Sequence, residues 1–420
     1  MRILIIGGGI GGLCLAHGLR GAGIDVEVYE RATETTEGLA GYGIHVNADG
    51  CRALGECLPE DNRARFDAVA GHARNTVRFS DEHLRTLAVR DGDLPADPAL
   101  QRRAVGRIAL REVLLHGLSD GPRGTEGVVR WGKEFTGYDH TANGRPRAHF
   151  ADGGHTVGDL LIGADGSNSR VRRQYLPELH RLDVGVLNIA GRYPLTPRNA
   201  ARLPATLIDG SVNNIVPPRS GWMFVSAWRA PREHGDTDYA VWAYAAARRT
   251  YPSDVRHLGP EGLRDLVLAR IDGWAPALRA LVADCDPSTV SPVSLHSMPV
   301  LRPWPSSTVT LLGDAIHNMT PMAGVGANTA LRDAGVLRRA LIEVAAGRRT
   351  PIDAIADYER EMRDYANRAI GMSLRNARNA GSDALLPRQA FRTMLRVAQA
   401  VPPIKRVLFS ERGSVASHGK

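Results

Sequence analysis

The opening stretch, MRILIIGGGIGGLCLAHGLRGAGIDVEVYER, reads as strand, glycine-rich turn, helix and strand in immediate succession. Residues 2–6 form a short apolar run of the kind that makes a buried parallel strand. The helix that follows carries Leu13, Ala16 and Leu19 on one face, and the glycines near residue 21 end it. The alternating run IDVEVYE then predicts a second strand. The chain therefore begins as a βαβ unit with two parallel strands.

Three glycines in the first turn fit the spacing G-x-G-x-x-G. Gly7 allows the tight turn, Gly9 lets the backbone approach a pyrophosphate, and Gly12 lets the helix pack close to the strand. The helix N-terminus adds free N–H groups and a positive dipole. Glu30, at the end of the second strand, can bind the ribose hydroxyls of an adenosine and would repel a 2′-phosphate. These features predict a dinucleotide, and they disfavour NADP as the ligand of this turn.

Two further predicted strands are each followed by an adjacent Gly and Asp, in the order Asp-Gly after the first strand and Gly-Asp after the second. In GDLLIGADGSNSRVRRQ (158–174), a short strand is followed by Asp165-Gly166, which alone is also compatible with an ordinary turn. In STVTLLGDAIH, a β-branched apolar run ends at Gly313-Asp314, a position where α/β sheets place ligand groups. The next segment has residues that favour an open backbone: Pro321, Gly324 and Gly326. From Asn328 to Leu341 apolar residues repeat at helical spacing, so a helix with a second anion-binding N-terminus is predicted.

Bulk composition excludes several classes of protein. The chain has 420 residues, which favours two domains, and its 43% hydrophobic and 23% charged content is that of a globular protein. The net charge of +8 is spread along the chain without interleaved aromatics, so nucleic-acid binding is not expected. No apolar run reaches the ~20 residues of a membrane span. The four cysteines have no metal-type spacing, so no metal is expected, and a reduced cytoplasmic protein is the simplest interpretation.

Taken together, these motifs resemble those of the flavin-dependent monooxygenases of the para-hydroxybenzoate hydroxylase type, the single-component aromatic hydroxylases. A looser match, VGRIALREVLL at 105–115, is similar to the family's Arg-x-x-Leu helix and places Arg107 against the cofactor. The matches span about residues 1–345 and occur in family order. One departure lies at 38–54, where Tyr42, His45 and Asn47 replace smaller or apolar residues of the family's segment beside the flavin.

The resemblance implies one FAD held by both glycine-rich loops, the first taking its ADP half and the second its ribityl chain and isoalloxazine. Asp314 is expected at the ribityl hydroxyls, and the helix near Asn328 at the flavin ring. The residues assigned to the cofactor on this basis are Gly7, Gly9, Gly12, Glu30, Arg31, Arg107, Asp165, Gly166, Gly313, Asp314, Pro321, Gly324, Gly326 and Asn328.

The expected fold class is α/β, with a Rossmann-like FAD-binding domain, an inserted β-rich substrate domain and C-terminal helices. The FAD-binding domain is expected to be discontinuous and to comprise residues 1–70, 101–180 and 285–345. Residues 71–100 and 181–284, with several strand-like runs and Trp222, Trp228 and Trp242, are assigned to the substrate domain. Those tryptophans fit either core packing or an aromatic pocket wall. Residues 346–420 are expected to form helices ending in a polar tail.

The resemblance implies NAD(P)H-driven hydroxylation of an aromatic or phenolic small molecule by O2 through a flavin C4a-hydroperoxide. The Arg-rich composition is typical of GC-rich actinobacterial genomes, in which such enzymes often tailor natural products, so a role in secondary-metabolite or antibiotic biosynthesis is expected. NADH and NADPH are not distinguished, and either a monomer or a homodimer is expected. A Baeyer–Villiger or epoxidising enzyme of the same fold, and a catalytically silent FAD-binding protein, stay open as alternatives. A flavin-dependent halogenase is disfavoured, because the chain has no Lys before Lys133 and no Trp-x-Trp-x-Ile-Pro segment.

The family has no universal protein nucleophile, so none is expected. A base would only assist deprotonation of a phenol. The weak candidates for such catalytic or pocket roles are His45, Arg192, Tyr193, Arg219 and His296.

Overall fold

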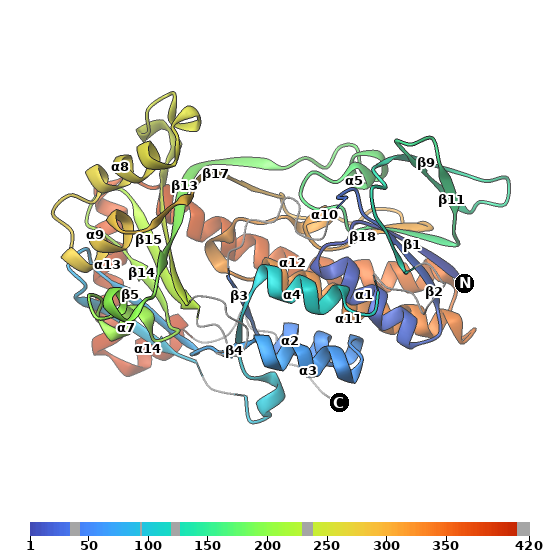
Figure 1. The fold of residues 1–420 in the computed structure, drawn as a ribbon, viewed down its shortest axis with the longest axis horizontal. Coiled ribbons are helices and arrows are strands. Elements are labelled where there is room, and N and C mark those ends of the chain that lie inside the picture. Colours follow the sequence, from blue (N-terminus) through green and yellow to red (C-terminus); the bar gives the residue numbers. More distant parts are fainter. Residues whose placement is uncertain (34–42, 93–94, 119–126, 229–237, 410–420) are drawn as a thin grey trace. The chain divides into compact units, whose positions relative to one another are not determined.

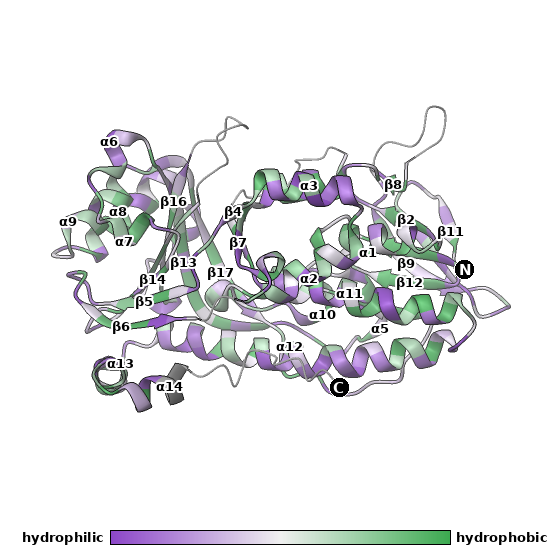
Figure 2. Cartoon of the chain, turned by 90° about the horizontal axis from the view of Figure 1, so that it is seen from below, coloured by the Kyte–Doolittle hydropathy of each residue, from purple (hydrophilic) through white to green (hydrophobic). Residues whose placement is uncertain are grey.

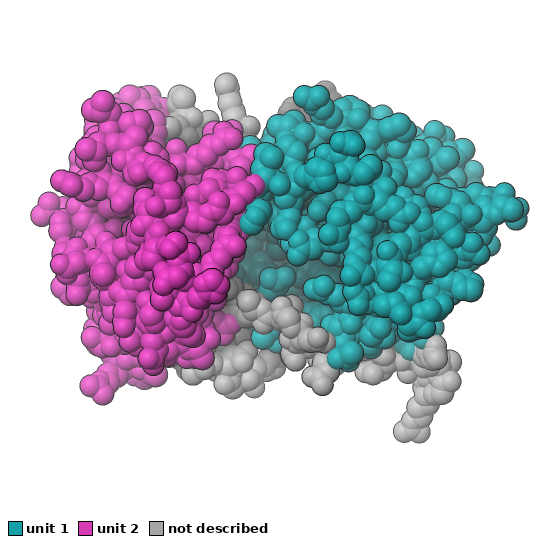
Figure 3. Space-filling model, turned by 90° about the horizontal axis from the view of Figure 1, so that it is seen from above, with its two compact units in different colours: residues 1–70, 95–182, 296–373 teal, residues 71–94, 183–295, 374–420 magenta. Residues whose placement is uncertain are grey.

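The computed structural model describes residues 1–33, 43–92, 95–118, 127–228 and 238–409. The chain divides into two compact units, drawn as ribbons in Figure 1 and coloured separately in Figure 3. Unit 1 comprises residues 1–70, 95–182 and 296–373, and unit 2 comprises residues 71–94, 183–295 and 374–420.

Unit 1 is built on a five-stranded sheet whose paired strands all run parallel, in the order β18-β12-β1-β2-β8. The bounds of these strands are β1 (Arg2–Ile6), β2 (Asp25–Tyr29), β8 (Val129–Arg130), β12 (Leu160–Gly163) and β18 (Val309–Leu311). Because the strands are parallel, all their carboxyl ends meet one edge of the sheet. Both strands of the predicted βαβ unit, and those predicted before Asp165 and Gly313, are confirmed.

Helices cover this sheet, and Figure 2 shows hydrophobic residues along its strands. The helices within unit 1 are α1 (Ile10–Gly21), α2 (Ala48–Cys57), α3 (Glu60–Val69), α4 (Arg107–Leu115), α5 (Arg170–Tyr175), α10 (Asp314–His317) and α11 (Gly326–Ala345), with the 3₁₀ turns η1 (Pro98–Leu100) and η4 (Pro321–Ala323). Helix α1 packs against both α2 and α11. The helix predicted from Asn328 to Leu341 is confirmed as α11, which begins two residues earlier.

Short antiparallel strands complete unit 1. Strands β9 (Phe135–His140), β10 (Pro146–Phe150) and β11 (His155–Val157) form one small sheet in the order β11-β10-β9. Strands β3 (Gly43–Val46) and β7 (Arg103–Gly106) pair antiparallel, with His45 opposite Ala104.

Unit 2 is built on a seven-stranded sheet in the order β17-β13-β16-β15-β14-β5-β6. The strands of this sheet are β5 (Thr76–Ser80), β6 (Thr86–Asp91), β13 (Leu182–Pro194), β14 (Val212–Ile215), β15 (Trp222–Trp228), β16 (Tyr239–Ala247) and β17 (Asp286–Ser297). The short strand β4 (Gly71–His72) also belongs to unit 2 but lies outside this sheet. Only β14 and β5 pair in parallel among the pairs described.

The helices of unit 2 are short except for one near the C-terminus. They are α6 (Pro197–Ala200), α7 (Ala205–Ile208), α8 (Pro260–Arg270), α9 (Pro276–Ala283), α13 (Leu385–Ala400) and α14 (Pro402–Phe409), with the turns η2 (Arg248–Thr250) and η3 (Val255–His257). The long helix α12 (Pro351–Gly381) contributes residues to both units.

One of the strand-like runs of the expected substrate domain, TLIDGSVNNIVPP (206–218), forms a strand only in part. Helix α7 takes its first residues, and β14 begins at Val212. Pro204 is the N-cap of α7, and its carbonyl accepts a hydrogen bond from the Leu207 N–H at 2.9 Å, which closes a helical turn in place of a strand. Tyr42 and the polar tail from residue 410 onward lie outside the described residues. Among the described residues, no helix is both long and apolar enough to cross a membrane.

The tryptophans of unit 2 divide between the two faces of its sheet. Trp242 is fully buried in a core cluster with Met223, Val225 and Tyr244. Its neighbours in sequence point the other way, because side chains alternate along a strand. On that other face Trp228 stacks on Tyr239, with ring centroids 6.0 Å apart. Core packing therefore accounts for Trp242, whereas Trp228 belongs to a separate aromatic cluster.

Replacing Trp242 by alanine is expected to lower the free energy of unfolding of the protein by about 3–5 kcal/mol, the usual loss for a buried Trp. Chemical denaturation followed by far-ultraviolet circular dichroism measures this. Trp228→Ala is the matched comparison on the opposite face. A Trp242 variant as stable as the wild type would contradict the placement of this side chain in the core.

Candidate functional site

The predicted motifs follow neighbouring strands of the parallel sheet of unit 1. Gly7 and Glu30 come directly after β1 and β2, and Asp165 and Gly313 come two residues after the ends of β12 and β18. Strands β18, β12, β1 and β2 are consecutive in the sheet. Four segments that are far apart in sequence therefore converge on one sheet edge, where open α/β sheets bind their ligands.

The glycines of the first loop have different structural causes. Gly7 has a φ of +110°, and a Cβ placed there would lie 2.4 Å from the Ala164 carbonyl oxygen. A Cβ at Gly12 would lie 2.4 Å from the Gly7 oxygen. At Gly9, in contrast, the nearest atom to an added Cβ is the Ala164 oxygen at 3.9 Å. The chain's own packing requires glycine at positions 7 and 12, whereas no close contact within the protein requires it at position 9.

Glu30 is anchored against the first loop. Its Oε2 accepts a hydrogen bond from the Gly8 N–H at 2.7 Å, and its Oε1 accepts one from the Ala32 N–H at 2.9 Å. The Arg111 Nη2 lies 3.8 Å from Oε2. Burial lowers the pKa of Arg111, although the charge of Glu30 works in the opposite direction. The carboxylate therefore has a fixed position beside the turn, and each oxygen retains a further lone pair.

Asp165 also faces inward with unused hydrogen-bonding capacity. Its Oδ2 accepts from the Arg170 N–H at 2.7 Å and the Val171 N–H at 3.2 Å, which caps α5. Its Oδ1 is buried and has no hydrogen-bond partner among the described residues. Burial raises the pKa of Asp165, against hydrogen bonds from Ser169 and the two backbone groups. An unpartnered buried oxygen at the ligand edge of the sheet indicates a missing hydrogen-bond donor.

The third loop turns sharply after β18. Gly313 has φ of 64° and ψ of −146°, a region that favours glycine. The one-turn helix α10 then exposes Asp314 and buries Ala315, Ile316 and His317. The Arg172 Nη1 donates to the Ala315 carbonyl at 2.7 Å and holds this turn from α5. Asp314 is exposed, and its carboxylate makes no hydrogen bond within the described residues.

The segment from Pro321 to Asn328 leads from η4 into α11. Gly324 has a φ of +65°, and an added Cβ there would meet nothing within 4 Å. Gly326 begins α11. The Asn328 side chain is engaged inside unit 1, because its Nδ2 donates to the His45 carbonyl at 2.8 Å and its Oδ1 accepts from the Asn47 N–H at 2.8 Å. Its contribution to a ligand would therefore come from the helix N-terminus.

The other residues assigned to the cofactor lie at the surface of unit 1. Arg31 is exposed next to Glu30, and Arg107 is exposed as the first residue of α4. Gly166 follows Asp165 with a φ of +73°.

The five weak catalytic candidates divide between the two units. His45 is 9% exposed in unit 1, and burial lowers its pKa well below the ordinary value, assisted by the charge of Arg102. His296 is half-buried near the end of β17, and the division between the units places it in unit 1, although most of that strand belongs to unit 2. In unit 2, Arg192 lies over the Tyr239 ring, with its Cζ 4.7 Å from the centroid. Arg219 is exposed.

Tyr193 is fully buried in the core of unit 2, and its hydroxyl donates to the Asn199 carbonyl at 3.2 Å. Alternation along β13 places its neighbour Arg192 on the opposite face of the sheet. Tyr193 therefore occupies a core position.

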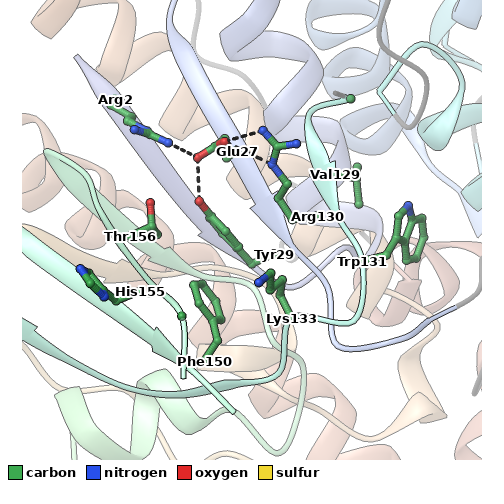
Figure 4. A pocket seen from close by; sticks show the side chains of 12 residues that line it. Arg2, Glu27, Tyr29, Val129, Arg130, Trp131, Lys133, Phe150, His155 and Thr156 are labelled. Atoms are coloured by element: carbon green, nitrogen blue, oxygen red, sulfur yellow. Dashed lines mark hydrogen bonds and ion pairs between the residues drawn. The ribbon is translucent and has the colours of Figure 1, made fainter. Parts of the chain in front are cut away.

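A cavity of about 550 Å³ opens at another part of unit 1, and none of the predicted site residues lines it. Figure 4 shows Arg2 and Arg130 on either side of Glu27, with the Tyr29 hydroxyl below it. The Tyr29 hydroxyl donates to Glu27 at 2.6 Å, and the Arg130 Nη2 at 2.9 Å. Burial would raise the pKa of Glu27, but the hydrogen bonds from Tyr29, Arg2 and Arg130 together lower it. The carboxylate is satisfied by the protein itself.

Sequence reasoning missed three polar residues that support the loops: Arg111, Arg172 and Asp333. All three lie on helices in patterns that local spacing cannot distinguish from a solvent-facing charge. Each is buried and contacts a motif loop through hydrogen bonds or an ion pair. Among the described residues, no group of three or more His, Cys, Asp or Glu side chains is placed to hold a metal ion.

Comparison with known families agrees with this arrangement. A family model described as an FAD binding domain matches residues 268–373, and one described as an NAD(P)-binding Rossmann-like domain matches residues 5–50. The FAD-dependent urate hydroxylase of Klebsiella oxytoca is 31% identical over 350 residues, which cover 80% of this chain and 80% of that protein. The dual O-methyltransferase/FAD-dependent monooxygenase CTB3 of Cercospora beticola is 33% identical over 407 residues. That match covers 88% of this chain but 45% of CTB3, so the chain spans about half the length of this relative.

Solved structures show the same fold. A protein of Photorhabdus luminescens subsp. laumondii assigned as an FAD-containing monooxygenase is 47% identical, with a TM-score of 0.83 over 90% of this chain and 98% of that one. Klebsiella pneumoniae HpxO, solved with FAD and uric acid, has a TM-score of 0.75 at 24% identity, over 96% of this chain and 95% of that one. The convergent loops and these relatives together show that the chain belongs to the FAD-dependent monooxygenases of the para-hydroxybenzoate hydroxylase type.

Proposed function

We propose that this protein binds FAD across the loops at the carboxyl edge of the unit 1 sheet and uses it as an NAD(P)H-driven monooxygenase on an aromatic small molecule. The observation that carries the proposal is the convergence of Gly9, Glu30, Asp165 and Asp314 after four neighbouring parallel strands. A single mononucleotide would need only the first loop. A longer ligand such as FAD would extend from the first loop to the loop after β18, which would bind its flavin half.

The residues present fit FAD. The open space at Gly9 and the N–H groups at the start of α1 suit a pyrophosphate. Glu30 is fixed where a ribose can meet it, and the exposed Asp314 can accept hydrogen bonds from ribityl hydroxyls. The N-terminus of α11, which begins at Gly326, offers N–H groups and positive dipole to an electron-rich ring edge.

Bound FAD would supply the redox chemistry, accepting hydride and activating dioxygen. The protein's own part is to bind, orient and exclude water. The remaining residues assigned to the cofactor, Arg31, Arg107 and Gly166, are proposed as contacts at its edges. His45 would remain neutral, because burial lowers its pKa. Its backbone carbonyl accepts a hydrogen bond from the Asn328 side chain, which joins β3 to α11.

An aromatic substrate is supported by the relatives. Their names state that one group acts on urate, and another, from Pseudomonas fluorescens, is a 6-hydroxynicotinate 3-monooxygenase that is 28% identical over 357 residues. The seven-stranded sheet of unit 2 has an aromatic cluster on the face opposite its core, with Arg192 over Tyr239. We propose that this face serves the substrate. The route of oxygen activation and the role in secondary metabolism stay predictions.

The test starts from the flavin content of the purified protein. After reconstitution with FAD and removal of free ligand, the ratio of bound flavin to protein is expected to approach one, measured by visible absorbance of the released flavin. Nicotinamide consumption should then rise on addition of an aromatic substrate. A protein that binds FAD tightly but is never reduced by NADH or NADPH, with any of a broad panel of phenols and heteroaromatic compounds, would support the silent flavoprotein instead. A protein that binds no FAD would contradict the proposal.

A further inference from the structure

A fully buried carboxylate lies directly behind the third loop. Asp333, on α11, is 0% exposed, as are His317 and Ala315 in α10. The Asp333 Oδ2 accepts a hydrogen bond from the Gly313 N–H at 2.7 Å and lies 2.6 Å from the His317 Nε2. Its Oδ1 accepts from the Tyr365 hydroxyl, on α12, at 2.5 Å. One side chain on α11 thus contacts both ends of the Gly313–His317 turn and also α12, so it joins three segments of unit 1.

The two residues that contact the Asp333 Oδ2, Gly313 and His317, lie on either side of Asp314 in the sequence. Gly313 immediately precedes it, and His317 closes the single turn of α10 three residues later. Both ends of this turn are therefore fixed to the same oxygen atom, while the residue between them, Asp314, is exposed. A further hydrogen bond joins α12 to the end of β18, where the Tyr358 hydroxyl donates to the Leu311 carbonyl at 2.9 Å.

The electrostatics favour an ion pair in this cluster. Burial disfavours a charged His317, but the charge and hydrogen bond of Asp333, together with the charge of Asp314, outweigh this and raise the pKa of His317 above its ordinary value. A buried charge is costly unless it is fully paired, and here three donors converge on one carboxylate. Three hydrogen bonds therefore hold the Asp333 carboxylate against Gly313, His317 and Tyr365, although the His317 Nδ1 has no hydrogen-bond partner among the described residues.

We propose that Asp333 is a positioning residue, which fixes the Gly313–His317 turn so that Asp314 is held in place for the ribityl half of FAD. This inference rests on the proposed binding of FAD. Asp333 contacts the third loop, and no hydrogen bond described joins it to the first loop at Gly7–Gly12. The binding of the flavin half of FAD should therefore depend on Asp333, and the binding of the ADP half should not. A defect in positioning should affect the flavin half and spare the ADP half.

The variant Asp333→Asn tests this, with the dissociation constants for FAD and for ADP each measured by isothermal titration calorimetry. The amide keeps the shape but loses the charge and presents a donor where acceptors are needed. We expect the FAD constant to rise by about tenfold or more, as for loss of a hydrogen bond to a charged group. The ADP constant should stay at the wild-type value, and the bound flavin spectrum should shift.

The matched control is Tyr365→Phe, which removes only the bond to Oδ1 and leaves the turn attached. It should bind FAD nearly as the wild type does. If Asp333→Asn binds FAD normally, or if it weakens FAD and ADP equally, the positioning role is overturned. Failure of the wild type itself to bind FAD would instead contradict the proposed function.

A second pair of variants covers the case in which Asp333→Asn does not fold. His317→Ala removes the donor at the end of α10, whereas His317→Gln keeps a side-chain N–H that can reach Asp333. We expect the alanine variant to lose FAD affinity selectively and the glutamine variant to recover most of it. Equal affinities in the two variants and the wild type would overturn the proposal.

Discussion

The variant Gly9→Val is expected to fold normally and to retain almost no FAD. An added Cβ at position 9 meets no protein atom closer than 3.9 Å, so the folded chain tolerates a side chain there. The same side chain would occupy the space that a pyrophosphate needs and would block its hydrogen bonds to the loop. Hydrogen bonds to charged groups contribute about 1.5–3 kcal/mol each. Loss of two predicts a rise of the FAD dissociation constant of about a hundredfold or more.

Gly12→Val provides the contrast, because its Cβ would lie 2.4 Å from the Gly7 carbonyl oxygen inside the protein. This variant should lose stability as well as FAD, by about 1–3 kcal/mol as for other overpacked positions. Calorimetric titration with FAD and thermal unfolding of both apoproteins separate the two effects. A Gly9→Val protein with wild-type flavin content would remove the first loop from the FAD site.

The second large effect is expected at Asp314. The variant Asp314→Ala should keep most of the stability of the wild type, because this exposed carboxylate makes no hydrogen bond within the described residues and acts on His317 and Arg172 only through its charge. It should bind FAD about ten- to a hundredfold more weakly, the equivalent of about 1.5–3 kcal/mol for hydrogen bonds to a charged group. Its affinity for ADP should be unchanged, in contrast to Gly9→Val, which should lose both.

Glu261→Ala, in the first turn of α8 in unit 2, controls for the loss of one exposed negative charge at a helix start. It should leave the flavin content unchanged. If Asp314→Ala purifies fully yellow and active, the assignment of the loop after β18 to the ribityl chain is wrong.

Much of unit 1 could be predicted because its signals are local. A continuous apolar run, three glycines at fixed spacing and an acid at a strand end specify β1, α1 and β2 with no reference to the rest of the chain. The approach of Gly7, Asp165 and Gly313 could not be predicted in this way. It depends on β12 pairing with β1 and β18 pairing with β12, contacts between residues more than 140 positions apart.

The burial of Asp333 and of Tyr193 could not be predicted from local sequence signals either. An aspartate within a helix usually faces water, and only the packing of α10, α11 and α12 shows that Asp333 is buried behind the third loop. Alternation along β13 shows that Arg192 and Tyr193 face opposite sides of the sheet, but it does not state which side is the core. The helices of unit 2 decide that, and they place Tyr193 in the core.

The most direct test of the central claim is anaerobic reduction of the FAD-loaded protein by NADPH and by NADH, followed at the flavin absorbance maximum in a stopped-flow instrument. The reaction is measured with and without a panel of phenolic and heteroaromatic compounds. The account predicts that a nicotinamide bleaches the flavin and that an aromatic substrate accelerates the bleaching. A flavin that stays oxidised with both nicotinamides, in the presence of every compound, would contradict it.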